Sequence, residues 1–145
     1  MPPNPNPNPD PATPDPATPG PATPGPATVV AAIIAAREAD DLDTSLSFVA
    51  PASLDQGRPS TRADWRAKWE AMRAGIPDLT VTTEHRVEQG EWVSHRYLLR
   101  GTSTGTLFGQ PTATGPFEIH GLDMVRVRDG LLVEHWAFTE PLSPA

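Results

Sequence analysis

The chain has 145 residues, 19 prolines, no cysteine and a formal net charge of -7 at pH 7. The lack of cysteine excludes a disulfide scaffold, a thiol nucleophile and thiolate metal sites. A net negative chain without a run of Lys and Arg is a poor partner for nucleic acid or for anionic membranes. No apolar stretch reaches the roughly 18 residues that a membrane span needs, and the N-terminus lacks the basic region of a signal peptide. We therefore expect a cytoplasmic protein that binds neither nucleic acid nor membrane.

Proline divides the chain into two parts. Residues 1–28 hold 12 of the 19 prolines, in Asn-Pro repeats and in near-repeats of Pro-Ala-Thr-Pro, which leaves 7 for the other 117 residues. Because proline fixes φ and removes the amide donor, this segment is predicted to be a disordered, extended tail. A spacer without a partner is favoured over a peptide ligand, since low complexity alone specifies no binding site. Residues 29–145 are enough for one domain with its own core.

Two helices are predicted at the start of this domain. The first covers residues 29–40 and is capped by Thr28, and the second begins after Ser60 or Thr61 and ends at Gly75. A loop rich in Pro, Ser and Asp is expected between them. Three large apolar side chains lie on one stripe of the second helix: Trp65, Trp69 and Met72.

From Leu79 the apolar period changes from helical spacing to two, which indicates strands. Four antiparallel strands are predicted, at about 79–87, 92–102, 117–128 and 131–140, with a Gly- and Thr-rich loop before the third. The order of two helices followed by a meander predicts an α+β domain, with helices on one face of a curved antiparallel sheet.

The hairpin at Gly130 decides which polar residues meet. A three-residue loop would place Asp123 opposite His135, whereas a two-residue loop would send His135 to the other face. We favour the three-residue loop because it gathers seven apolar side chains on one face: Phe117, Ile119, Val125, Val127, Leu131, Val133 and Ala137. A carboxylate beside an imidazole on an apolar wall is suited to proton transfer, and equally to a buried structural ion pair.

The other histidines carry weaker predictions. His85 and His95 share strand faces with apolar residues, so either could line the same cavity, although a partly buried core histidine is the commoner case. His120 falls on the opposite face and is expected at the surface or an interface. No His-x-His or His-x3-His spacing occurs, so no metal site is expected.

The opposite face of the last hairpin is apolar as well. Its large side chains are Leu122, Met124, Leu132, Trp136 and Phe138. Such a face needs a cover, and the short C-terminus favours a second copy of the chain, so a homodimer is predicted.

Six segments of the domain stand out by their order and spacing. They are Asp41-Leu42-Asp43, Ala50-Pro51-Ala52-Ser53-Leu54-Asp55-Gln56-Gly57, Ile76-Pro77-Asp78-Leu79, Gly101-Thr102-Ser103-Thr104-Gly105, Phe108-Gly109-Gln110-Pro111-Thr112 and Arg126-Val127-Arg128-Asp129-Gly130-Leu131-Leu132-Val133-Glu134-His135-Trp136. Together, over roughly residues 33–141, they resemble the SnoaL-like polyketide cyclases of the nuclear-transport-factor-2-like superfamily.

The resemblance implies a cone-shaped α+β barrel around a deep apolar cavity. It further implies an acid/base residue that closes a ring of an aromatic polyketide by an aldol step, without metal or organic cofactor. In this chain the acid/base residues would be Asp123 and His135. The cavity residues would be Tyr97 as a hydroxyl donor, the histidines His85 and His95, and the apolar walls Trp65, Trp69 and Phe108.

Four positions depart from the family pattern. The family's acid/base aspartate, two residues after the last-strand histidine, is Ala137, and an active-site histidine of the preceding strand is Asp123. Ala50 and Ser103 replace an asparagine and a histidine. Three readings stay open: the acid/base role has moved to Asp123 and His135, the chemistry resembles that of the epoxide hydrolases or isomerases sharing this fold, or the protein only binds a small molecule.

Overall fold

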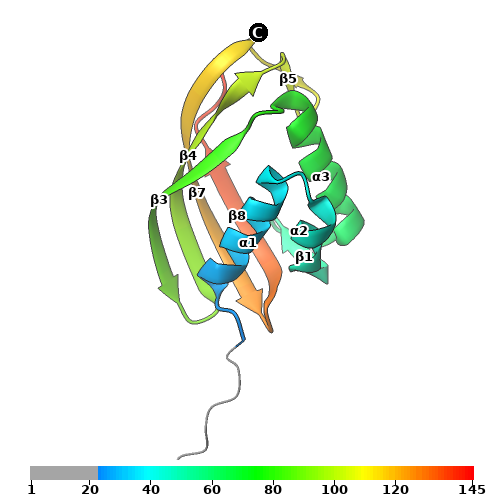
Figure 1. Cartoon of the computed structure of the whole chain (residues 1–145), viewed down its shortest axis with the longest axis vertical. Helices are drawn as coiled ribbons and strands as arrows, with labels where there is room; N and C mark the ends of the chain where they lie inside the picture. Colours follow the sequence, from blue (N-terminus) through cyan, green and yellow to red (C-terminus); the bar gives the residue numbers. More distant parts are fainter. Residues whose placement is uncertain (1–22) are drawn as a thin grey trace, which may run out of the picture.

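A computed structural model describes residues 23–145 of the chain. The tail predicted at residues 1–28 therefore lies for the most part outside the described residues. Helices α1 (Pro26–Glu38), α2 (Leu42–Ser47) and α3 (Arg62–Gly75) pack on one side of a long, curved sheet, as Figure 1 shows. The strands are β1 (Val49–Asp55), β2 (Arg58–Thr61), β3 (Thr80–Gln89), β4 (Trp92–Ser103), β5 (Thr106–Leu107), β6 (Gln110–Pro111), β7 (Gly115–Arg128) and β8 (Leu131–Thr139). This confirms the predicted α+β class.

The main sheet has six strands in the order β2-β1-β8-β7-β4-β3. The predicted meander is present as β3, β4, β7 and β8, all paired antiparallel. Strand β1 extends the sheet beyond this meander by pairing in parallel with β8. Strands β5 and β6 form a separate two-stranded ribbon. The long β4, β7 and β8 strands thus form the wall against which the helices pack.

Both predicted helices form, and one begins earlier than expected. Helix α1 starts at Pro26 with Gly25 as its N-cap, so Thr28 lies inside the helix and is not the cap. Proline suits this first position because its missing N–H would have no partner there. Helix α3 has the predicted cap: Thr61 and Asp64 form a reciprocal capping box.

The predicted loop between the helices contains regular structure instead. Asp41 caps the short helix α2, accepting a hydrogen bond from the Thr44 N–H at 3.0 Å. The β1–β2 hairpin follows, and Pro51 lies within the irregular part of the β1–β8 pairing, between Val49 and Leu54. The sequence pattern does not predict such a strand, because its alternation is broken and because proline is tolerated in a sheet only at edges and bulges.

The β7–β8 hairpin has a two-residue turn, contrary to the prediction. Asp129 and Gly130 have φ of 51° and 75°, as a type I′ turn requires. Arg128 therefore pairs with Leu131, and the pairing then slips so that Val133 is an extra residue in β8. This bulge returns the later part of β8 to the expected face, so that Val125 pairs with His135.

The core lies between the concave face of the sheet and the helices. Its buried cluster comprises Ala27, Val29, Val30, Ile33, Leu42, Leu46, Val49, Trp65, Trp69, Val93, Val125, Val127 and Leu132. Leu132 is thus a core residue and not part of the outer apolar face, a correction that follows from the two-residue turn, which pairs Leu132 with Val127 before the bulge. Within residues 23–145, none of the helices combines the length and apolar character that crossing a bilayer demands.

The outer face of the last hairpin keeps the rest of its predicted apolar side chains. Leu122, Met124 and Phe138 are 56%, 47% and 69% exposed, whereas Trp136 is half-buried over the β1–β2 turn, 3.0 Å from a Cβ built on Gly57. Three large apolar side chains therefore face outward on neighbouring strands.

Candidate active site

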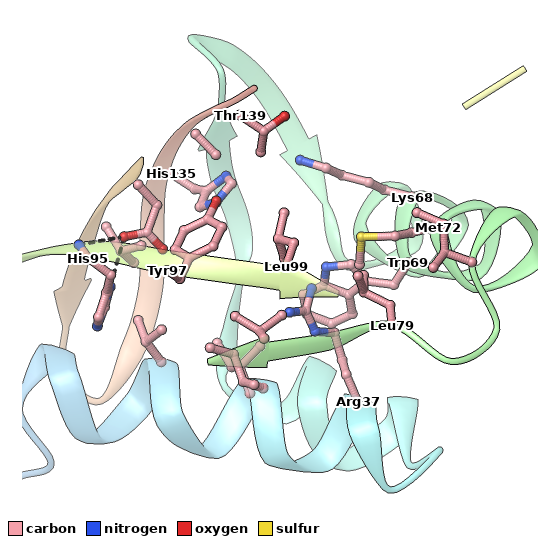
Figure 2. Close-up of a pocket in the computed structure, with 18 of the residues that line it drawn as sticks. Arg37, Lys68, Trp69, Met72, Leu79, His95, Tyr97, Leu99, His135 and Thr139 are labelled. Carbon is pink, nitrogen blue, oxygen red and sulfur yellow. Dashed lines mark hydrogen bonds and ion pairs between the residues drawn. The ribbon is translucent and has the colours of Figure 1, made fainter. Parts of the chain in front are cut away.

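A cavity of about 290 Å³ lies between the concave face of the sheet and helices α1 and α3. This volume is close to the lower end of the range for small-molecule sites, roughly 300–1,000 Å³. Most of its walls are apolar, among them Val30, Ile33, Trp65, Trp69, Met72, Leu99, Ile119 and Val125. The polar or charged side chains that line it are Arg37, Gln56, Lys68, Thr83, His95, Tyr97, Asp123, His135 and Thr139. Figure 2 shows several of them around this space.

His135 is held by a carboxylate from a neighbouring strand. Asp55, the last residue of β1, pairs with His135 in the parallel register, and its Oδ1 lies 2.9 Å from the imidazole Nδ1. The other oxygen of Asp55 accepts a hydrogen bond from Lys68 Nζ at 2.7 Å. The His135 ring packs on Trp65 in a T-shaped arrangement, with centroids 5.3 Å apart. The imidazole is therefore fixed from two sides.

The ionisation state of Asp55 decides which role the Nδ1 atom of this histidine has in their hydrogen bond. Burial alone would raise the pKa of Asp55, but hydrogen bonds from His135 and Lys68 lower it, and the resulting pKa lies below its usual value. Asp55 is then ionised near neutral pH, so Nδ1 of His135 carries the proton and donates. Among the described residues, every side-chain nitrogen or oxygen that solvent cannot reach has a hydrogen-bond partner. The unbonded Nε2 is therefore accessible, and this leaves it free for chemistry.

A second pair of the same kind joins strands β4 and β7. His95 and Asp123 are directly opposite in the register, and both His95 Nδ1, at 2.7 Å, and the His95 backbone N–H, at 2.9 Å, contact Asp123 Oδ1. Because this oxygen already accepts the backbone N–H, the ring nitrogen donates. Both side chains are deeply buried, 5% and 10% exposed.

Tyr97 lies two residues further along β4 than His95, on the same face of the sheet, and is positioned by a glycine. It is paired with Gly121, and a Cβ built on that glycine would lie only 2.4 Å from Tyr97 Cε2. Burial and the charge of Asp123 raise the pKa of Tyr97 to about 12, although Arg37 acts in the opposite direction. The phenol is therefore neutral near pH 7 and can donate a hydrogen bond into the cavity.

The predicted pairing of Asp123 with His135 is wrong, because of the two-residue turn and the bulge. Asp123 is opposite Ala137, and each of the two residues is bound to another partner. Both still line one cavity, since the bulge keeps them on the same face as diagonal neighbours.

Of the remaining residues singled out in the sequence, some line the cavity and others lie on the outer face. Trp65, Trp69 and Phe108 line the cavity, the two tryptophans almost fully buried and Phe108 48% exposed. His85 does not line it: the pairing of β3 with β4 slips between Thr83 and His85, so His85 is opposite Arg96 on the outer face. His120 is half-exposed near Glu84 and Glu140, as a surface residue was expected to be.

Sequence reasoning did not single out two charged residues that line the cavity, Arg37 and Lys68, or Asp55, which contacts the cavity residues His135 and Lys68. Features of the sequence could have pointed to each of them. Asp55 belongs to a segment that carries the family resemblance, and Lys68 is three residues after Trp65 on the same helix. Arg37 is four residues after Ile33, on the buried side of α1. Within residues 23–145, no group of three or more His, Cys, Asp or Glu has an arrangement that could hold a metal ion.

A cavity enclosed by a curved sheet and helices defines the fold as nuclear-transport-factor-2-like. A profile of the SnoaL-like polyketide cyclase family matches residues 27–144. The chain therefore belongs to the SnoaL-like polyketide cyclase family, a family of enzymes that act on small polyketide molecules. This confirms the family that the sequence motifs indicated.

Solved structures agree with this assignment. IdmH from Streptomyces antibioticus is 32% identical, with a TM-score of 0.68 over 79% of this chain and 91% of that one. A SnoaL-like polyketide cyclase from Agrobacterium tumefaciens is 16% identical, with a TM-score of 0.74 over 81% and 92%, and TsrD from Streptomyces laurentii is 21% identical, with a TM-score of 0.67 over 77% and 85%. These last two show the fold alone. No curated protein matches the chain.

Proposed function

We propose that the protein is a cyclase that closes a ring of an aromatic polyketide by an aldol-type step, in the biosynthesis of a secondary metabolite such as an antibiotic. The observation that supports this most is the convergence of two carboxylate–imidazole pairs, Asp55–His135 and Asp123–His95, on one apolar cavity. Either pair alone fits a structural ion pair. Two pairs with accessible groups beside a neutral phenol fit proton transfer at two positions of one ligand.

The position of Asp123 supports an acid/base role for it. Ala137 stands where the family resemblance places an acid/base aspartate, and Asp123 is directly opposite Ala137 on the neighbouring strand. Side chains that face each other across antiparallel strands have Cβ atoms about 4.5–5.5 Å apart. A carboxylate at position 123 can therefore reach the space that a longer side chain at position 137 would fill.

The first chemical step is enolate formation. The Asp123 carboxylate, oriented by His95, removes a proton from the carbon next to a carbonyl group, and the electron pair of that C–H bond moves to the carbonyl oxygen. The neutral Tyr97 hydroxyl donates a hydrogen bond to this oxygen, where negative charge develops. The apolar walls limit the access of water, which strengthens these interactions.

The second step closes the ring. The enolate carbon bonds to a second carbonyl carbon of the same molecule, and the oxygen of that carbonyl takes a proton from the Nε2 of protonated His135. Asp55 stabilises the protonated imidazole. The proton held by Asp123 then passes through solvent to His135, so that the enzyme returns to its starting state.

Turnover of folded variants tests this proposal. Asp123→Asn and His135→Gln keep the size of each side chain and remove its proton chemistry, so each should slow the closure of an aromatic polyketide ketone by about 10²–10⁴-fold. His85→Ala changes a histidine on the outer face and should leave the rate unchanged. Unchanged turnover in both cavity variants would refute the assignment and leave a protein that only binds.

We further propose that two copies associate through the outer face formed by Leu122, Met124 and Phe138. Their exposure is the supporting observation, because large apolar side chains on adjacent strands are costly in water. This face is on the opposite side of the sheet from the cavity, so association would leave the site open.

A further inference from the structure

Arg37 is a charged residue of the cavity that the proposed mechanism does not use. It belongs to the last turn of α1, and its guanidinium carbon lies 5.3 Å from the centre of the Trp69 ring. Figure 2 shows the side chain extending from α1 toward Trp69, on the opposite side of the cavity from His135. Stacking on an aromatic face orients the plane of a guanidinium and leaves its edges available for hydrogen bonds.

No acidic residue neutralises this guanidinium at close range. Among residues 23–145 no carboxylate oxygen lies within 4.0 Å of it, whereas the neighbouring Arg73 is ion-paired with Asp40. The carboxylates in this region already have partners: Asp55 binds His135 and Lys68, Asp123 binds His95, and Glu38 accepts a hydrogen bond from the Val81 backbone N–H.

The environment of Arg37 disfavours an uncompensated charge. Burial lowers the pKa of Arg37 from its usual value, and Coulombic interactions with Tyr97, Glu38 and Asp123 offset only part of this effect. A buried cation without a counter-ion is unfavourable. Since no fully buried side-chain nitrogen in the described residues lacks a partner, the unbonded guanidinium nitrogens are accessible to solvent, and Arg37 lines the cavity. The cavity therefore contains hydrogen-bond donors with a positive charge and no protein acceptor.

We propose that Arg37 binds a carboxylate group of the substrate, so that the cavity accepts polyketide acids in preference to their neutral esters. A carboxylate supplies the missing charge, and its two oxygens match the planar fork of a guanidinium in a bidentate pair. Fixing the acid at the α1 side directs the rest of the molecule toward Tyr97, Asp123 and His135. This inference rests on the proposed function, because it assumes that the cavity holds an aromatic polyketide.

Binding of two matched probes tests the inference without turnover. Anthraquinone-2-carboxylate and its methyl ester share the aromatic system and differ in charge, and calorimetry gives a Kd for each. The wild type should bind the acid at least about tenfold more tightly than the ester. Arg37→Met keeps the length of the stem and should abolish that preference, whereas Arg37→Lys keeps the charge, loses the fork and should retain part of it.

Arg73→Met is the matched control, because it removes a nearby arginine that is already ion-paired outside this cavity. It should keep the preference for the acid. Three results would overturn the inference: no binding of the acid by the wild type, equal binding of acid and ester, or an unchanged preference in Arg37→Met that melts at the wild-type temperature.

Turnover separates this inference from the proposed function. If the acid preference depends on Arg37 but no polyketide ketone is cyclised, the cavity binds acids and the proposed function fails. If a polyketide ester is cyclised as fast as its acid and Arg37→Met changes neither rate, the proposed function stands and the carboxylate inference fails.

Discussion

Gly121→Ala should displace Tyr97 and so lower both stability and activity. A methyl group at position 121 would lie 2.4 Å and 2.7 Å from two ring carbons of Tyr97 and 2.9 Å from its hydroxyl oxygen. Gly121 does not have a positive φ, so an alanine is compatible with its backbone. The perturbation is therefore the contact with the ring and not strain in the main chain.

The size of the effect follows from these distances. Carbon atoms in contact prefer a separation of about 3.5–4.0 Å, so the ring must retreat by about 1 Å. Overpacking of this kind destabilises proteins by about 1–3 kcal/mol. A catalytic group misplaced by about 1 Å can cost roughly 10²-fold in rate. We expect both losses in Gly121→Ala.

A double-mutant cycle with Tyr97→Val isolates the contact. Urea unfolding of the four proteins gives the stability cost of the methyl group with and without the ring. That cost should fall below about 0.5 kcal/mol in the Tyr97→Val background, because the side chain that clashes is gone. An equal cost in both backgrounds, or wild-type stability and turnover in Gly121→Ala, would refute the reasoning that Gly121 positions Tyr97.

Three further predictions concern other parts of the molecule. Hydrogen bonds from Arg128 and Arg126 lower the pKa of Glu91 from 4.5 to about 2, so the stability lost in Glu91→Gln should be full above pH 4.5 and vanish as pH falls to about 2, as thermal melts at each pH would show. Phe138→Lys should shift the protein to monomer in sedimentation without loss of turnover, and a wild-type monomer would contradict the proposed dimer. Asp55→Asn should reduce turnover by about 10-fold or more because His135 loses the carboxylate that stabilises its protonated form, and a wild-type rate would exclude this role.

Alternation and capping in the sequence were enough to predict the α+β class, the α3 helix and the four long strands. The β7–β8 hairpin shows why the pairing of the site residues was harder to predict than the fold. Its turn type was predictable from Asp129-Gly130, a dipeptide typical of a type I′ turn. The bulge at Val133 was not, because an extra residue leaves no signature in a strand of mostly apolar side chains.

The slip in β3 had a similar effect on the histidines. Simple alternation put His85 and His95 on cavity faces, and the irregularity between Thr83 and His85 moved only the first of them outward. The partner of His135 came from β1, a strand interrupted by Pro51 and distant in sequence. Contacts between strands so far apart depend on sheet order, which local periodicity does not contain.

Hydrogen exchange at carbon tests the central claim most directly, because it reports proton removal by Asp123 without requiring ring closure. An aromatic polyketide ketone is incubated with the enzyme in D2O, and proton NMR follows the loss of the signal next to the carbonyl group. The wild type should catalyse this exchange, and Asp123→Asn should slow it by about 10²–10⁴-fold, while His85→Ala, altered on the outer face, exchanges at the wild-type rate. Exchange at the wild-type rate in Asp123→Asn would contradict the account.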